Sequence, residues 1–467
     1  MPQLSAVDQA FFLLETSERP MNIGALIVLV PPSGSERGFA NRLVSSMLTR
    51  PVGPPFNYHL RTGPIPGLHW FEADQHMDPA PQVHRHALRH GSELAALCKR
   101  VCDLHVRPLS RDAPLWELHV FTGLPQSRVA LYFKTHHGLI DGIGFIRILN
   151  TMFSTRPSMR SPRAIWEGML AVATPTGATQ RGEGSRRLQQ ALEVPRTALD
   201  TVRLLWRQGL RSLGRGPGLP LPFFTPNVLK AAPSPHRAMA HCQLPLRQVR
   251  RIATHSGAKV NDVLLAVLDI AMNRYLEERN LVPDKPLVAD VPVALEDHGG
   301  AGNRITILQV PMGIPRSRPA DRLRRILSET RQVKQEVQAL AGGSVVLYSI
   351  VHHAIASAIE SLGLVRLPML ANAVISNVSG GLQRRAYFNG AAMELGLPVS
   401  VVAHHQALNI TITTYMQDLH VTFMALREAI PGIERLAQYT VEAVSMLEAD
   451  LRRRPGRGRR RGGSAWR

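Results

Sequence analysis

The chain has 467 residues, of which 44% are hydrophobic and 19% are charged, a composition ordinary for a folded globular protein. This composition excludes a mostly disordered chain, and the length predicts two or more domains. The 55 Lys and Arg residues against 35 Asp and Glu residues give a net charge of +20, which fits nucleic acid, an anionic membrane or an anionic small substrate as a partner.

The excess positive charge is concentrated in two segments. Residues 452–467 contain eight arginines and no acidic residue, and residues 181–215 contain eight arginines against three acidic residues. Together the two segments carry 13 of the 20 excess charges. The rest of the chain is therefore only mildly basic, and it shows no clear nucleic-acid-binding module.

The first 155 residues mix helical and strand patterns. In chain order, the patterns predict a helix at 4–15, a strand at 23–31, a helix at 36–49, a Pro/Gly-rich loop at 51–67, a helix at 92–106, strands at 117–122 and 128–134, and a helix at 143–153. The two adjacent strands are joined by a short loop containing Gly123 and Pro125, which predicts a hairpin.

Residues 155–235 are rich in Pro, Gly, Ser and Arg, which predicts a long connection that includes an amphipathic helix at 196–213. Regular patterns then return, with helices at 246–255 and 261–276, strands at 286–292 and 304–312, helices at 319–340 and 344–362, strands at 373–377, 399–402, 408–414 and 419–425, and a helix at 433–451. Because both halves mix strands and helices, the fold class is α/β or α+β.

Cysteine usage and apolar runs bear on compartment and metal binding. The three cysteines are too few for a disulfide framework. Cys98, Cys102 and His105 could belong to a metal cluster or to one apolar helix face, and no second ligand pair follows at zinc spacing, so no metal is expected. The N-terminus lacks the basic region of a signal peptide, and no apolar run reaches the ~20 residues of a membrane span. We expect a soluble or peripheral protein in a reducing compartment.

The motif with the clearest chemistry is HHGLIDG, from His136 to Gly142, directly after a predicted strand. A neutral imidazole there can accept a proton from a hydroxyl group. Asp141 can orient the turn, and Gly142 permits close backbone approach or a positive φ. The alternative is a buried, hydrogen-bonded pair formed by His136 and His137 in a turn.

The pattern HHxxxDG resembles the active-site motif of the CoA-dependent acyltransferase superfamily, which is similar to chloramphenicol acetyltransferase in fold. Further segments resemble the bacterial wax ester synthase/diacylglycerol acyltransferase family. They are Leu4-Ser5-Ala6-Val7-Asp8, Phe12, Glu15, Pro20-Met21-Asn22, Pro114-Leu115-Trp116, Asn261-Asp262, Gly302-Asn303-Arg304, Ser376-Asn377-Val378 and Leu408-Asn409. The resemblance extends from residue 4 to about residue 451.

The resemblance implies two chloramphenicol-acetyltransferase-like domains, each with a mixed sheet and helices, and an active-site tunnel between them. The corresponding division is 1–178 for an N-terminal acyltransferase domain with the motif, 179–235 for a basic linker, 236–451 for a C-terminal acyltransferase-like domain, and 452–467 for a disordered Arg-rich tail.

The implied reaction moves a long-chain acyl group from acyl-CoA to the hydroxyl of diacylglycerol or of a long-chain alcohol. His137 would be the general base, His136 a supporting neighbour, and Asp141 a structural residue beside Gly142. Acyl-CoA is a substrate in this scheme, and no cofactor and no partner protein are expected.

The resemblance also implies residues that bind substrate. Asn261 would donate to the thioester oxyanion, or it would simply cap the helix that follows. Trp116 would line the acyl tunnel with its neighbours, or it would belong to the core. The remaining candidates are Pro114, Leu115, Asn303, Ser376 and Asn377.

The basic segments indicate where such an enzyme would act. Residues 196–213 place Arg on one face and Trp and Leu on the other, which suits an anionic membrane or lipid-droplet surface, or a helix packed on its own domain. We therefore expect a cytoplasmic protein at the inner face of the plasma membrane or at lipid inclusions, with no nucleic acid bound. A condensation-type acyltransferase of secondary metabolism and a catalytically silent lipid-surface protein are the alternative functions.

Overall fold

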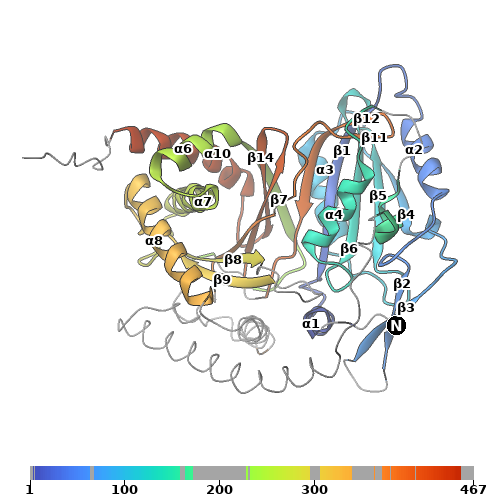
Figure 1. Cartoon of the computed structure of the whole chain (residues 1–467), viewed down its shortest axis with the longest axis horizontal. Coiled ribbons are helices and arrows are strands. Elements are labelled where there is room, and N and C mark those ends of the chain that lie inside the picture. Colours follow the sequence, from blue (N-terminus) through green and yellow to red (C-terminus); the bar gives the residue numbers. More distant parts are fainter. Residues whose placement is uncertain are drawn as a thin grey trace, which may run out of the picture.

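The computed structural model contains two six-stranded sheets that lie side by side, each covered by helices (Figure 1). It describes residues 4, 6–63, 68–157, 163–171, 228–229, 232–294, 305–338, 362, 371–378, 380–404 and 406–453. The segment 196–213, Asn303, the tail beyond residue 453 and nearly all of 344–362 lie outside these residues.

The elements of the first half confirm the predicted alternation and add short strands. They are α1 (Ala6–Leu14), β1 (Asn22–Val30), α2 (Phe39–Leu48), β2 (Tyr58–Thr62), β3 (His69–Ala73), the short helix η1 (Ala80–Gln82), β4 (Val83–Ala87), α3 (Leu94–His105), β5 (Trp116–Thr122), η2 (Pro125–Ser127), β6 (Val129–His136), α4 (Gly142–Met152) and η3 (Ile165–Ala171). β5 and β6 form the predicted antiparallel hairpin.

The second half is built from comparable elements. They are β7 (Arg237–Pro245), α6 (Leu246–Ser256), α7 (Val260–Glu277), β8 (Val288–Ala294), β9 (Ile305–Pro311), α8 (Pro319–Gln338), β10 (Ala373–Asn377), β11 (Tyr387–Phe388), β12 (Ala391–Val399), β13 (Leu408–Tyr415), β14 (Asp418–Leu426) and α10 (Ile433–Arg452). The strand expected at 399–402 is wrong, because β12 ends at Val399.

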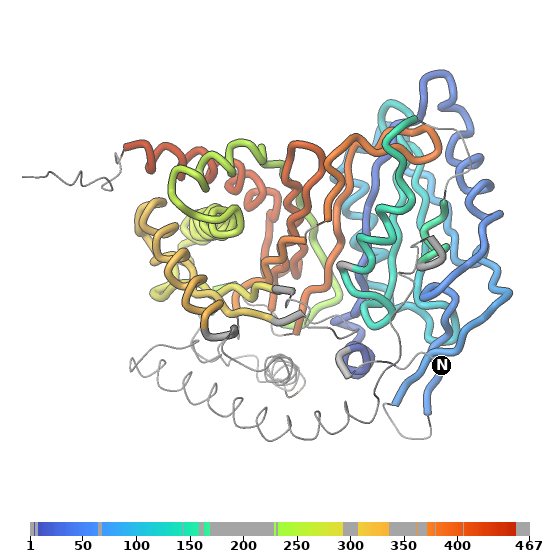
Figure 2. Tube along the Cα trace, in the orientation of Figure 1, coloured from blue at the N-terminus to red at the C-terminus, as the bar shows by residue number. Residues whose placement is uncertain are grey.

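The first sheet has the strand order β11-β12-β1-β6-β5-β4. Its two outer strands β11 and β12 come from the second half of the sequence, and β12 pairs with β1 from Gly24 and Val399 to Val30 and Ala392. Figure 2 shows this late segment crossing into the half of the molecule formed by the N-terminal residues. β11 and β12, which lie within the expected C-terminal domain 236–451, therefore complete the edge of the first sheet beside β1.

The second sheet has the order β7-β14-β13-β10-β8-β9. β10 pairs in parallel with both β13 and β8, and the other pairs are antiparallel. The helices α6, α7, α8 and α10 supply the apolar side chains that cover this sheet. β10 is therefore an interior strand, and Asn377 at its C-terminal end lies opposite Ile412 of β13.

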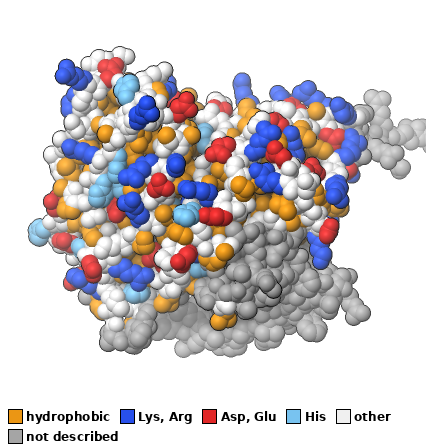
Figure 3. Space-filling view, turned by 180° about the vertical axis from the view of Figure 1, so that it is seen from behind, with side chains coloured by type: hydrophobic (Ala, Val, Ile, Leu, Met, Phe, Trp, Pro, Cys, Tyr) orange, Lys and Arg blue, Asp and Glu red, His pale blue; other side chains and the backbone are white. Residues whose placement is uncertain are grey.

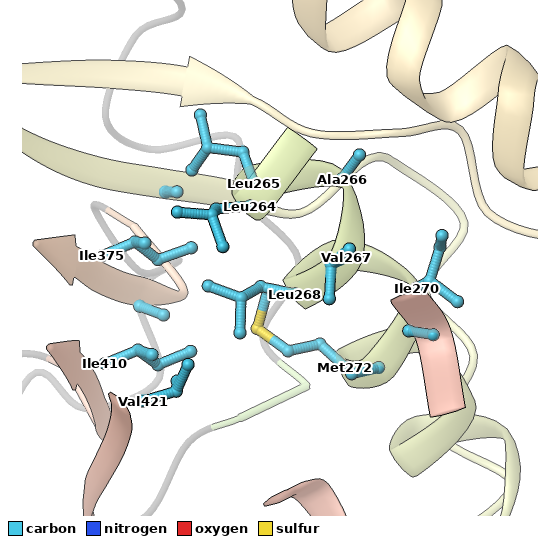
Figure 4. Close-up of a cluster of buried hydrophobic side chains, with 14 of the residues drawn as sticks. Leu264, Leu265, Ala266, Val267, Leu268, Ile270, Met272, Ile375, Ile410 and Val421 are labelled. Carbon is cyan, nitrogen blue, oxygen red and sulfur yellow. The ribbon is translucent and has the colours of Figure 1, made fainter. Parts of the chain in front are cut away.

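The central helix of the second half is α7, which is buried around nearly its whole circumference. A helix that is apolar on all sides belongs in a core. Figure 4 shows Leu264 and Leu268 of α7 directed toward Ile375 of β10 and Ile410 of β13. This packing fixes the start of α7, where the candidate residue Asn261 lies, against the end of β10.

A third apolar cluster joins the two halves. It combines α3 and the first sheet with β7 and β14, through residues such as Cys98, Leu395, Met239 and Met424. Burying apolar area of this kind is the dominant favourable contribution to association of the two halves. The two sheets therefore share one packed interface in addition to the crossover of β12.

The surface shown in Figure 3 carries basic, acidic and apolar side chains interspersed over the described part of that face. This mixing agrees with the mild basicity expected of the folded parts. Within the ranges that the structure describes, no helix combines the length and apolar character needed to cross a bilayer.

Candidate active site

The histidine pair lies at the end of β6, an interior strand of the first sheet. His136 is the last residue of β6, and its N–H donates to the carbonyl of Leu115 over 3.0 Å. The N–H of His137 donates to the carbonyl of Met21 over 2.7 Å. The backbone carbonyls of Leu115 and Met21 therefore hold the backbone of the histidine pair in place.

One backbone hydrogen bond to the His136 ring selects its tautomer. The N–H of Gly138 donates to His136 Nδ1 over 3.0 Å, so Nδ1 presents a lone pair and the proton resides on Nε2. Nε2 lies 3.5 Å from Glu15 Oε1, and the ring stacks on Phe12 with centroids 4.3 Å apart. His136 is nearly inaccessible to solvent. With its ring enclosed in this tautomer, His136 is suited to support its neighbour His137. It is not suited to accept a proton from a substrate.

His137 has the environment of a general base. Its ring stacks on Phe11 with centroids 4.0 Å apart, and the residue as a whole is partly exposed, although its Nδ1 is buried. Desolvation lowers the pKa of His137, against the opposing effects of its own carbonyl and of the Asp141 carboxylate. A lowered pKa keeps the imidazole neutral and able to accept a proton at physiological pH.

Asp141 is the N-cap of α4, where its Oδ1 accepts the N–H of Gly144 over 2.7 Å. The structure thus gives Asp141 a structural task in the turn. Gly142 does not have the positive φ that glycine permits, and a Cβ there would meet no described atom within 4 Å. Gly138 is the glycine that packing requires, since a Cβ there would lie 2.6 Å from the Phe12 ring.

Trp116 is fully buried in the core of the first half. Its indole N–H donates to the carbonyl of Phe56 over 2.8 Å, and its ring stacks between Trp166 and Phe133. A satisfied, fully enclosed indole favours the core role over the tunnel-lining role. Trp116 therefore acts on the site through the packing of β5.

The two residues before Trp116 are also buried. Leu115 touches the site through its backbone, because its carbonyl accepts both the His136 N–H and the Thr135 hydroxyl over 3.0 Å each. Pro114 precedes this contact and donates no backbone hydrogen bond of its own. The segment from Pro114 to Trp116 thus supports the end of β6 from the neighbouring strand.

Asn261 and Asn377 are brought together from distant parts of the sequence. The Asn377 Nδ2 donates to the Asn261 Oδ1 over 2.5 Å. Asn261 is not a helix N-cap, because α7 is capped at Lys259, whose N–H donates to Asp262 Oδ2 over 2.9 Å. Among the described residues, neither amide is in hydrogen-bond contact with the histidine pair.

Ser376 and Asn303 are the two remaining candidates for substrate binding. Ser376 is half-buried on β10 and lies opposite Thr411 in the parallel register with β13, and Asn303 lies outside the described residues. The loop after Asn377 contacts the first half, since Asn150 of α4 donates to the Gly380 carbonyl over 2.7 Å. The helix that Asp141 caps therefore touches the loop that follows the asparagine pair.

Sequence reasoning missed the contribution of α1 and the residues beside it to the histidine pair. Phe11 and Phe12 stack on the two imidazoles, Glu15 approaches His136, and Arg111 Nη2 lies 3.4 Å from Glu15 Oε2. The adjacent aromatics at the end of an amphipathic helix were visible in the sequence, but helical periodicity indicates burial and not the partner.

The cysteines on α3 fit the apolar-helix alternative. Cys98 and Cys102 are both buried, and burial raises the pKa of each thiol to about 12. His105 Nδ1 lies 2.7 Å from the Tyr132 hydroxyl. In the described ranges, no three His, Cys, Asp or Glu side chains are arranged to hold a metal ion.

A histidine pair at the end of an interior strand, in two joined mixed sheets, is the arrangement of the chloramphenicol-acetyltransferase-like class of CoA-dependent acyltransferases. Solved structures agree. The wax ester synthase/diacylglycerol acyltransferase of Marinobacter aquaeolei matches with a TM-score of 0.73 and 25% identity, over 96% of this chain and 100% of that one. The first condensation domain of the CDA synthetase matches with a TM-score of 0.57 and 15% identity over 95% of each chain, which supports the fold alone.

Sequence comparison identifies the family within this class of acyltransferases. The profile of the wax ester synthase/diacylglycerol acyltransferase catalytic domain matches residues 4–264, and that of the WS/DGAT C-terminal domain matches residues 301–448. A putative diacylglycerol O-acyltransferase of Mycobacterium tuberculosis is 32% identical over 95% of this chain and 99% of its own. The O-acyltransferase WSD of Acinetobacter baylyi is 30% identical over 96% of this chain and 97% of its own. The chain belongs to the wax ester synthase/diacylglycerol acyltransferase family.

Proposed function

We propose that this chain transfers a long-chain acyl group from acyl-CoA to a hydroxyl of diacylglycerol or of a long-chain alcohol. Family membership over nearly the whole chain supports this O-acyltransferase activity. The observation that carries the mechanism is the imidazole of His137, which stacks on Phe11 and whose pKa is lowered by desolvation.

His137 removes the proton from the acceptor hydroxyl, and the resulting oxygen attacks the thioester carbonyl carbon. The C–S bond then breaks, and the protonated His137 returns its proton to the CoA thiolate. One base serves both proton transfers, so the acyl group passes directly between the two bound substrates without a resident cofactor or metal.

The developing oxyanion requires a hydrogen-bond donor. Asn261 is the proposed donor, because acceptance from Asn377 Nδ2 fixes its Oδ1 and turns its own Nδ2 away from Asn377. Ser376 would lie beside this pair. The two substrates would meet at His137 from a tunnel between the sheets.

The alternative of a silent lipid-surface protein is disfavoured by the intact geometry around His136 and His137. The alternative of a condensation-type acyltransferase is weaker as well, because the condensation-domain match is more distant in sequence and in structure than the family match.

We place the enzyme at an anionic lipid surface, at the inner face of the plasma membrane or on lipid inclusions. The concentration of Arg in 181–215 and 452–467 supports this placement. Deleting 454–467 spares α10, which ends at Arg452. The deletion should weaken binding to phosphatidylglycerol-containing vesicles, with no change in acyl transfer to a soluble short-chain alcohol. Unchanged vesicle binding would exclude a role for the tail.

The activity is tested with purified protein, labelled palmitoyl-CoA and either diacylglycerol or hexadecanol, with His137→Ala alongside. We expect labelled triacylglycerol or wax ester from the wild type and at least a hundredfold less from the variant. No ester with either acceptor, or full activity of the folded variant, would refute the proposal.

A further inference from the structure

We propose that Glu15 is a positioning residue that fixes both histidines of the motif through one carboxylate. The proposal rests on the proposed function of His137 as the base. The Glu15 side chain is only 9% exposed and lies just after α1, more than a hundred residues before the motif in sequence. Its Oε1 contacts two groups that hold the histidine pair, and its Oε2 faces Arg111.

The first group is the His136 ring. The Gly138 N–H donates to Nδ1 of that ring, so the ring proton lies on Nε2. Nε2 lies 3.5 Å from Glu15 Oε1. This distance is long for a hydrogen bond, so the contact is chiefly electrostatic. A carboxylate there favours the Nε2–H tautomer, and that tautomer is the one that lets Nδ1 accept from Gly138.

The second group is the peptide of Met21, which connects Glu15 to His137. Glu15 Oε1 accepts the Met21 N–H over 3.1 Å, and the Met21 carbonyl accepts the His137 N–H over 2.7 Å. The carboxylate therefore positions the residue that holds the backbone of the base. Displacement of either contact moves the His137 ring relative to Phe11.

Arg111 restrains the carboxylate from its other side. Its Nη2 lies 3.4 Å from Glu15 Oε2 and donates to the Phe12 carbonyl over 3.0 Å. Arg111 thus links Glu15 to the helix whose aromatic ring stacks on His136. Burial opposes ionisation of Glu15, but contacts with His136, Met21 and Arg111 outweigh it and lower the pKa of Glu15.

A double-mutant cycle tests whether Glu15 acts through His136. The variants are Glu15→Gln, His136→Ala and the double variant, with kcat and the KM for palmitoyl-CoA measured for each. Glu15→Gln should lower kcat about tenfold and change KM less than about twofold, since a small misplacement of a catalytic group lowers the chemical rate. In the His136→Ala background the same change should lower kcat by a smaller factor than in the wild type, because only the route through Met21 then remains.

The matched control is Glu72→Gln, which removes a carboxylate from an exposed pair with Arg61. Such a pair contributes little, so kcat should be unchanged. Arg111→Met provides a second variant that loosens the carboxylate without removing it, and it should lower kcat about threefold. If Glu15→Gln does not fold, the cycle with His136→Ala is carried out with Arg111→Met.

Wild-type kcat in folded Glu15→Gln, or losses that multiply fully in the double variant, would overturn the positioning role. Wild-type kcat in Arg111→Met would overturn it where Glu15→Gln is unfolded. These outcomes differ from failure of the proposed function, which would appear as no ester from the wild type or as full activity in His137→Ala.

Discussion

β6 of the first sheet and β10 of the second sheet are both interior strands, and both end in polar side chains. β6 ends in imidazoles that aromatic rings, backbone groups and Glu15 enclose. β10 ends in half-buried Ser376 and Asn377, and the Asn377 amide donates to another amide, that of Asn261. The titratable imidazoles thus lie at the strand end of the first sheet. Uncharged polar side chains lie at the strand end of the second sheet.

The largest effect is expected from removing the proposed base, His137. His137→Gln keeps a polar side chain of similar reach but cannot accept a proton at neutral pH, so kcat should fall about a thousandfold. Release of CoA thiol from palmitoyl-CoA in the presence of hexadecanol measures the loss. His76→Gln, at an exposed histidine, is the control and should keep wild-type kcat. A loss below tenfold in the folded variant would mean that another group acts as base.

Removal of a donor at the other strand end should have a smaller effect. Asn261→Ala should lower kcat about a hundredfold if its amide stabilises the oxyanion. Asn377→Ala should cause a smaller loss, because it frees Asn261 to rotate without removing the donor. Steady-state kinetics of both variants make the comparison. A larger loss in Asn377→Ala than in Asn261→Ala would assign the donor to Asn377 instead.

Much of this arrangement could be predicted from the sequence. Two strand patterns joined by the short loop with Gly123 and Pro125 predicted the hairpin of β5 and β6, and the HHxxxDG pattern placed the histidine pair at the end of β6. The mixed class and the order of most helices also follow from local patterns, because a helix or strand face is encoded within a few residues of sequence.

The partners of those elements could not be predicted in the same way. β12 alternates buried and less buried residues from Ala391 to Val399, but Gly396 and Pro398 weaken its strand signal. Its pairing with β1 also joins residues more than 360 positions apart. The approach of Glu15 to His136 is equally non-local, so spacing along the chain carries no information about it.

A smaller effect is expected from the cap that follows the histidines. Asp141→Ala removes the acceptor for the Gly144 N–H and should lower the free energy of unfolding by about 1 kcal/mol. Asp141→Asn should largely preserve that stability, because an amide oxygen can still accept the bond. Urea unfolding of both variants provides the measurement. Equal destabilisation by Ala and Asn would show that the carboxylate charge matters more than the cap.

The smallest expected difference between the two strand ends concerns how variants at each end change the pH dependence of kcat/KM. His137 must be neutral to accept a proton, and desolvation lowers its pKa below the usual 6.5, so kcat/KM should stay high until the pH falls below 6.5. The Asp141 carboxylate opposes this shift. Asp141→Asn should therefore lower the pKa further and move the acid limb to lower pH.

Asn377→Ala should lower the rate without moving that limb, because an amide does not titrate. The measurement is a profile of kcat/KM against pH for the wild type and the two variants, taken within the range where each stays folded. A limb above pH 6.5 in the wild type, or a shift to higher pH in Asp141→Asn, would contradict the electrostatic account of His137. A shift in Asn377→Ala would show that the two strand ends are coupled through the contact between Asn150 and Gly380.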